Sequence, residues 1–199
     1  MNIIKKPVYG FLILFTIFHI ILFGMRNEHQ VFWHLYTGLM LFSSIGYIFY
    51  ERNIHSKRLL DAIITGILTS FIIVILHTIL SFIMKDITYF HLLKVIVGLG
   101  VYVKWQLIIS LLISIPLQEL FFRNMLQNYL DDRFNQFVSA MIVSLCVTSL
   151  FMYFISIELL LFIFLTQFIL ALSYHNTKRL ITPIIGQIFA IIILMLIYR

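Results

Sequence analysis

The sequence predicts an all-α fold, a polytopic bundle of seven or eight transmembrane helices. Of its 199 residues, 62% are hydrophobic and only 11% are charged. Soluble domains are about half apolar and about a quarter charged, so a soluble fold of this length could not bury so much apolar surface. Several apolar runs also approach the roughly 20 residues that a membrane-spanning helix needs. We therefore expect residues 1–199 to form one multi-pass transmembrane domain in the cell membrane.

Seven apolar stretches have about the right length to cross the membrane as helices. Short polar segments such as Asp131-Asp132-Arg133 separate them. The expected spans are residues 7–25, 31–50, 59–84, 105–129, 134–154, 158–174 and 180–198. Residues 88–103 are less regular, because His91 and Lys94 interrupt them and two glycines lower their helix propensity. This segment forms an eighth span, a re-entrant piece or an interfacial helix.

The distribution of basic residues places the amino terminus in the cytoplasm. Fourteen Lys and Arg against 8 Asp and Glu give a net charge of +6. Lys5 and Lys6 precede the first span, and the loop 51–58 is also basic, which puts both on the cytoplasmic side by the positive-inside rule. Membrane topology and contact with membrane lipid account for this charge, so we expect no nucleic-acid partner. Short length and a composition rich in Ile and Phe favour a bacterial source.

Cofactor-binding patterns are absent from the sequence. Cys146 is the single cysteine, which excludes a disulfide framework and a thiolate metal cluster. There is no His-Glu-x-x-His motif, no pair of histidines at helical spacing and no glycine-rich phosphate loop. We therefore expect neither a metal nor another cofactor.

Residues 118–123, Gln-Glu-Leu-Phe-Phe-Arg, form a polar cluster inside an otherwise apolar stretch. A charge within a membrane helix costs roughly 2.5–3.5 kcal/mol, so it persists only where it is paired, hydrated or used. On a helix, Glu119 and Arg123 lie four residues apart on one face. Two interpretations stay open: a structural ion pair between helices, or the wall of a site in which the guanidinium fixes a carboxylate.

The spacing Pro116-x-x-Glu119-x-x-x-Arg123 resembles the first motif of the CPBP family, which comprises CAAX proteases and bacteriocin-processing enzymes and is also called the abortive-infection family. That motif reads Glu-Glu-x-x-x-Arg. The residues before position 187, with Pro183, resemble the approach to the third motif. The resemblance covers about residues 100–199. It implies the scaffold of a polytopic intramembrane endopeptidase.

The positions that carry catalysis in the family hold other residues in this chain. The first glutamate falls on Gln118, the histidine of the second motif, Phe-x-x-x-His, on Ile155, and the third motif, His-x-x-x-Asn or Asp, on Gln187 and Ile191. The resemblance implies that the first glutamate and the histidines activate a water molecule. An amide cannot accept that proton, and isoleucine offers no polar group. We therefore expect a catalytically inactive relative that binds or scaffolds another membrane or cell-envelope protein.

Two alternative functions stay open. His77 lies deep in the expected span 59–84, where a histidine is a functional candidate, although an imidazole that bonds a neighbouring helix is the more common case. An active peptidase could combine Glu119 as the base with His77. A small transporter or immunity-type protein would instead need polar residues on facing helices around an aqueous path.

Overall fold

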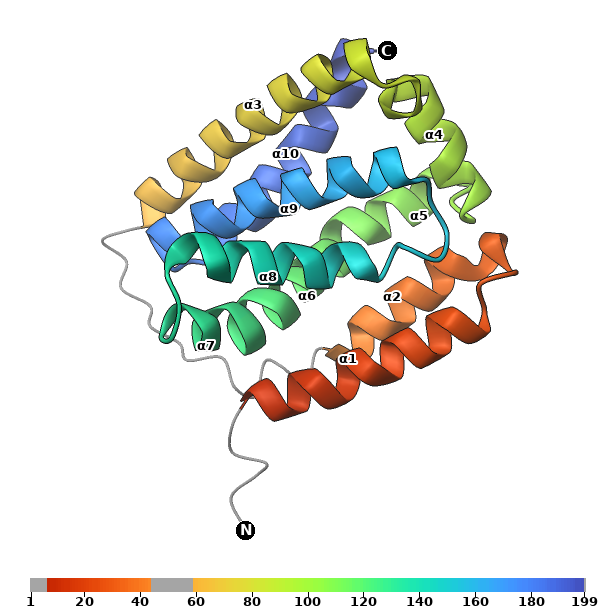
Figure 1. The fold of residues 1–199 in the computed structure, drawn as a ribbon. Coiled ribbons are helices and arrows are strands. Elements are labelled where there is room, and N and C mark those ends of the chain that lie inside the picture. The colour runs from red at the N-terminus through yellow and green to blue at the C-terminus, as the bar shows by residue number, and fades with distance from the viewer. Residues whose placement is uncertain (1–6, 44–58, 199) are drawn as a thin grey trace.

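The computed structural model describes residues 7–43 and 59–198, and within these ranges every regular element is a helix. Figure 1 shows most helices side by side along a common direction, so that their connections gather at the two ends of the bundle. The α-helices are α1 Pro7–Gly24, α2 Phe32–Phe42, α3 Leu59–Ile83, α4 Tyr89–Gly98, α5 Lys104–Ile109, α6 Ile115–Glu119, α7 Asn128–Asp131, α8 Gln136–Ser149, α9 Ile157–Thr177 and α10 Ile181–Ile197. The predicted all-α class is confirmed for this part of the chain.

Within residues 7–43 and 59–198, three helices are long and apolar enough to cross a membrane. They are Leu59–Ile83, Lys104–Asp131 and Ile157–Thr177. The second is one continuous helix that runs from α5 to α7. The apolar helices Val8–Gly24, Gln136–Ser149 and Ile181–Ile197 are shorter. The last part of the expected span 31–50 and the basic loop 51–58 lie outside the described residues.

Helix α4 occupies the segment 88–103, whose crossing the sequence leaves open. It has 10 residues, so it is about 15 Å long, half the thickness of a typical hydrocarbon core. The chain then turns at Gly100, whose φ of 102° lies in the left-handed region. A Cβ atom there would overlap the carbonyl oxygen of Gln30. The N–H of Trp33 donates to the carbonyl of Leu99 at 3.0 Å, which attaches this turn to the start of α2.

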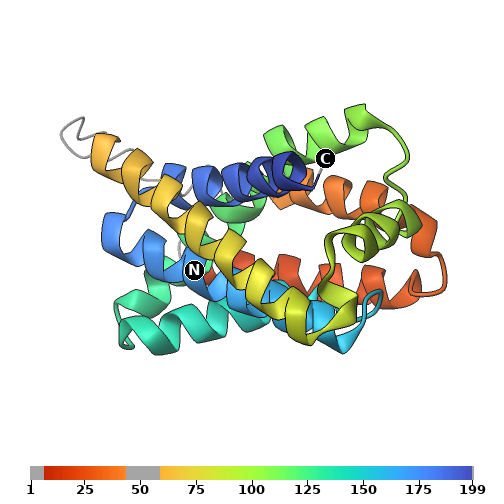
Figure 2. The same ribbon diagram turned by 90° about the horizontal axis from the view of Figure 1, so that it is seen from above.

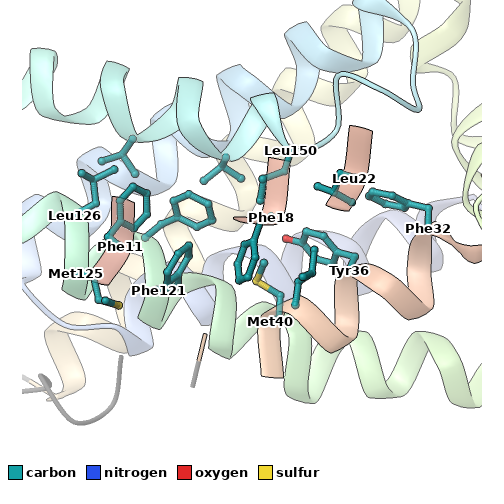
Figure 3. Packing of buried hydrophobic residues seen from close by; sticks show 14 of the residues in the cluster. Phe11, Phe18, Leu22, Phe32, Tyr36, Met40, Phe121, Met125, Leu126 and Leu150 are labelled. Carbon is teal, nitrogen blue, oxygen red and sulfur yellow. The ribbon is translucent and has the colours of Figure 1, made fainter. Parts of the chain in front are cut away.

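A core rich in aromatic side chains joins the amino-terminal helices to the polar-cluster helix. Figure 3 shows Phe11, Phe18, Phe32 and Phe121 among the buried side chains of this core. The rings of Phe11 and Phe18 on α1 lie 4.8 and 5.5 Å from that of Phe121. Phe32 on α2 lies 4.5 Å from Phe154, just beyond α8. This core holds α2 beside α6.

Helices α3 and α10 cross at very short range. Figure 2 shows α3 passing diagonally over α10. Ala62, Gly66 and Ser70 recur at every fourth position of α3 and are buried. A Cβ atom on Gly66 would lie 2.8 Å from the carbonyl oxygen of Thr182. Small residues at this spacing let helix backbones approach closely in membranes, so the crossing fixes the position of α10.

Candidate functional site

The polar cluster lies in a helix whose turns are wider than those of a regular α-helix. The segments Ser110–Ser114 and Leu120–Gln127 are π-helical and flank α6. Pro116 lies in α6 and has no N–H to donate to the preceding turn. Wide π turns of this kind are frequent at functional sites. In this helix the side chains of residues 123 and 127 bond to α9.

Glu119 and Arg123 form a buried ion pair. The Nε atom of Arg123 donates to Oε2 of Glu119 at 2.7 Å, and the two side chains are 0% and 1% exposed. The other carboxylate oxygen accepts a bond of 3.3 Å from Nε2 of Gln118. Both oxygens of the carboxylate are therefore engaged.

The guanidinium of Arg123 also binds α9. Its Nη2 atom donates to Oε1 of Gln167 at 2.8 Å and to the Gln167 carbonyl at 3.4 Å. Its Nη1 atom donates to Oε1 of Gln127 at 3.4 Å, and Gln127 in turn donates to the Ala171 carbonyl at 2.8 Å. Buried polar groups of this kind are stable only when their partners are present. The pair therefore connects two helices of the bundle.

Gln118 links the same network to the amino-terminal half of the chain. The hydroxyl of Tyr36, on α2, donates to Oε1 of Gln118. Both side chains are buried, at 3% and 4% exposed. The Gln118 amide thus accepts from Tyr36 and donates to Glu119, which leaves no proton-accepting group at this position.

A cavity of about 410 Å³ lies beside this network. Most of its wall is apolar and comes from α3, α4, α5, α9 and α10. The lining residues are Ile73, Tyr89, Leu92, Leu93, Ile96, Val97, Val101, Tyr102, Val103, Lys104, Leu107, Gln118, Phe151, Phe162, Ile163, Thr166, Gln167, Gln187, Ala190, Ile191, Leu194 and Met195. Gln118, Gln187 and Ile191, three of the predicted motif positions, therefore lie around one space.

Two other predicted positions lie away from this cavity. Ile155 is absent from its wall and packs against the aromatic core. The wall instead contains Phe151, the first residue of the same motif. Glu119 is also absent from the wall, although its neighbour Gln118 is part of it.

Two polar atoms of the wall are buried without a hydrogen-bond partner among the described residues. They are Oε1 of Gln187, on α10, and Oγ1 of Thr166, on α9. Sequence reasoning missed Thr166 and Gln167. Their signal was available, because they form the polar pair inside the apolar run 159–172. What the sequence could not reveal is that they face α6 and α10.

His77 lies on α3 among aromatic rings, apart from the Glu119 network. Its ring makes edge contacts with Phe162 and Tyr198, with centroids 5.7 and 5.8 Å away. The backbone of Ile87 interacts with the imidazole. His77 is fully buried but does not line the cavity. In residues 7–43 and 59–198, no group of three or more His, Cys, Asp or Glu side chains could hold a metal ion.

Comparison with protein families gives a match to the carboxy-terminal part of the chain. Residues 100–193 match the family of type II CAAX prenyl endopeptidase Rce1-like proteins. The resemblance to the CPBP family is therefore confirmed over this region, which contains the polar cluster and both later motif positions. Searches of curated proteins and of solved structures gave no match.

Proposed function

We propose that this chain, whose residues 100–193 match the Rce1-like family, is a membrane protein that holds an apolar chain in its cavity without cleaving a peptide bond. One observation carries the proposal. The cavity has the motif positions Gln118, Gln187 and Ile191 in its wall, and none of these side chains can take up a proton. The binding space of a protease-like scaffold is present, whereas its acid–base groups are replaced.

The position of Glu119 supports this interpretation. A general base must reach the proton that it abstracts, directly or through one water molecule. Glu119 is fully buried, bonded to Arg123 and Gln118, and absent from the cavity wall. His77 bonds to none of these three side chains and is enclosed by aromatic rings. These contacts argue against a peptidase that combines Glu119 with His77.

The dimensions of the cavity define what it holds. An α-helix with its side chains is about 10–12 Å wide, so a partner's membrane helix is too thick for a space of about 410 Å³. A single apolar chain fits. The mostly apolar wall also provides no polar path of the kind that a transporter needs. A partner protein of the membrane or cell envelope would bind the outer surface of the bundle or contribute a lipid chain.

We also propose seven crossings with a cytoplasmic amino terminus. The short length of α4 supports a segment that stays on one side. The turn Asp131–Arg133 and the Lys178-Arg179 loop then fall on the cytoplasmic side, in agreement with the positive-inside rule. Lys104 and the cavity rim near it fall on the opposite side.

Peptide hydrolysis tests the absence of catalysis. Purified protein in lipid nanodiscs is incubated with a farnesylated peptide that ends in a CAAX sequence, and we expect no cleavage above buffer. Cleavage that disappears in Ile191→Trp, which fills the cavity, would overturn the proposal. Photolabelling with diazirine-bearing hexadecane tests binding, and we expect labelled peptides from α9 and α10. Labelling confined to the outer surface would also contradict the proposal.

A further inference from the structure

The cavity has a polar inner end and a cationic rim. Lys104, exposed at the start of α5, belongs to the rim, together with Tyr102. Gln118 also belongs to the cavity wall and lies further along the continuous helix that begins at Lys104. The lining therefore extends about 20 Å along the helix axis. Tyr and Lys side chains are typical of the membrane–water interface, so the rim faces the interface and the glutamines lie deep.

The width of the cavity corresponds to one hydrocarbon chain. A volume of about 410 Å³ over a length of about 20 Å gives a mean cross-section of about 20 Å². This is the cross-section of a single extended alkyl chain. Two acyl chains side by side, or a folded peptide segment, would exceed this mean cross-section.

Among the described residues, the inner end of the cavity lacks an available charge. Arg123 is committed to Glu119 and Gln167 and does not line the cavity. The polar groups of the inner wall are the neutral side chains of Gln118, Thr166, Gln167 and Gln187. An ionised ligand group placed there would lose its hydration without gaining an opposite charge, which is strongly unfavourable.

Two of these neutral groups have unused hydrogen-bonding capacity among the described residues. Oε1 of Gln187 can accept one hydrogen bond, and the hydroxyl of Thr166 can donate one. A ligand hydroxyl both donates and accepts, so it can bond to Gln187 and to Thr166. A carboxylate cannot donate to Gln187, and a hydrocarbon can bond to neither.

We infer that the cavity binds an uncharged single-chain amphiphile of the long-chain alcohol class, with its hydroxyl at Gln187 and Thr166 and its chain toward the rim. This inference rests on the proposed function, because it assigns the chemistry of the chain that the cavity holds. Lys104 contacts the membrane surface and not the ligand's polar group.

Photolabelling in nanodiscs tests the inference with three probes of equal chain length. Diazirine-bearing hexadecanol, palmitate and hexadecane are compared at equal mole fractions, and labelled peptides of α9 and α10 are quantified. We expect hexadecanol to exceed both other probes. Gln187→Leu and Thr166→Val should each lower hexadecanol labelling about three- to tenfold, the effect of one hydrogen bond, and leave hexadecane labelling unchanged. Thr16→Val, on the exposed face of α1, is the matched control and should change neither.

The outcomes separate the two proposals. Equal labelling by hexadecanol and palmitate, or hexadecanol labelling that survives both variants, would overturn the alcohol class and leave a chain-binding cavity. Palmitate labelling that exceeds hexadecanol and falls in Lys104→Gln would assign the polar group to the rim and would also refute the inference. Absence of cavity labelling by all three probes would overturn the proposed function itself.

Discussion

The Nε atom of Arg123 donates to Oε2 of Glu119 at 2.7 Å, where both side chains are almost completely excluded from the surface of the protein. The same guanidinium reaches Oε1 of Gln167 on α9. The carboxylate that survives from the family motif is thus held by an arginine that also connects two helices. Lys104 is the charged side chain of the cavity wall beside the pair, and the other polar lining residues are neutral.

Loss of the arginine should destabilise the protein strongly. Arg123→Ala leaves the Glu119 carboxylate buried without its partner, which typically costs about 3–5 kcal/mol of folding free energy. We expect a large fall in folded yield and in the midpoint of thermal unfolding in detergent. Arg133→Ala is the control, because Arg133 is exposed and lies 4.3 Å from the ring of Tyr129; its removal should cost about 0.5–1 kcal/mol.

Replacement of Glu119 and Arg123 together separates the effect of an unpaired buried charge from the effect of lost packing. The double variant Glu119→Leu with Arg123→Met removes both charges, and well-packed apolar residues often replace a buried ion pair without loss of stability. We expect its unfolding midpoint to lie above that of Arg123→Ala. A double variant that is less stable than the single variant would show that an unpaired Glu119 carboxylate is not the cause of the loss in Arg123→Ala.

The link between α2 and α6 should contribute measurably to stability. Tyr36→Phe removes the donor to Oε1 of Gln118 and leaves that buried oxygen unpaired, at a cost of about 1–3 kcal/mol. Tyr9→Phe is the matched control, since Tyr9 is 43% exposed on α1. Unfolding midpoints in detergent compare the two. Equal midpoints would show that α2 packs on α6 through apolar contacts alone.

Composition and helical spacing predicted the all-α class and the i, i+4 arrangement of Glu119 and Arg123. Both depend on local sequence, because a helix brings residues four apart to one face. The partners of that pair depend on packing between distant segments. Tyr36 and Gln167 are 82 and 44 positions away from the residues they bond. Nothing in the local pattern indicates those contacts.

The cavity, too, has some features that the sequence predicts and others that depend on packing between distant segments. The motif comparison assigned Gln118, Gln187 and Ile191 to catalytic positions of the family. All three line the same cavity. It could not predict that Phe151 lines this space while Ile155 packs in the core. The chain leaves the helical conformation after α8, so four-residue spacing does not keep those two residues on one face.

Cysteine labelling tests the number of crossings. In a Cys146→Ser background, Lys85→Cys and Asp132→Cys place one thiol at each end of the segment that contains α4. With seven crossings and a cytoplasmic amino terminus, a membrane-impermeant maleimide should label intact cells at position 85 and not at position 132. Labelling at both positions would indicate an eighth crossing, and labelling at position 132 alone would reverse the orientation.

A bulky side chain in the cavity should block binding and leave the fold intact. Ile191→Trp adds an indole to a wall that surrounds about 410 Å³, so an apolar chain can no longer enter the full length of the space. Ile192→Trp places the same side chain on the neighbouring position of α10, which is 40% exposed and does not line the cavity. We expect photolabelling of α9 by diazirine-bearing hexadecane to fall at least tenfold in the first variant and to stay unchanged in the second. The unfolding midpoint of each variant checks that both are folded. Equal labelling in the two variants would show that the chain binds elsewhere on the bundle.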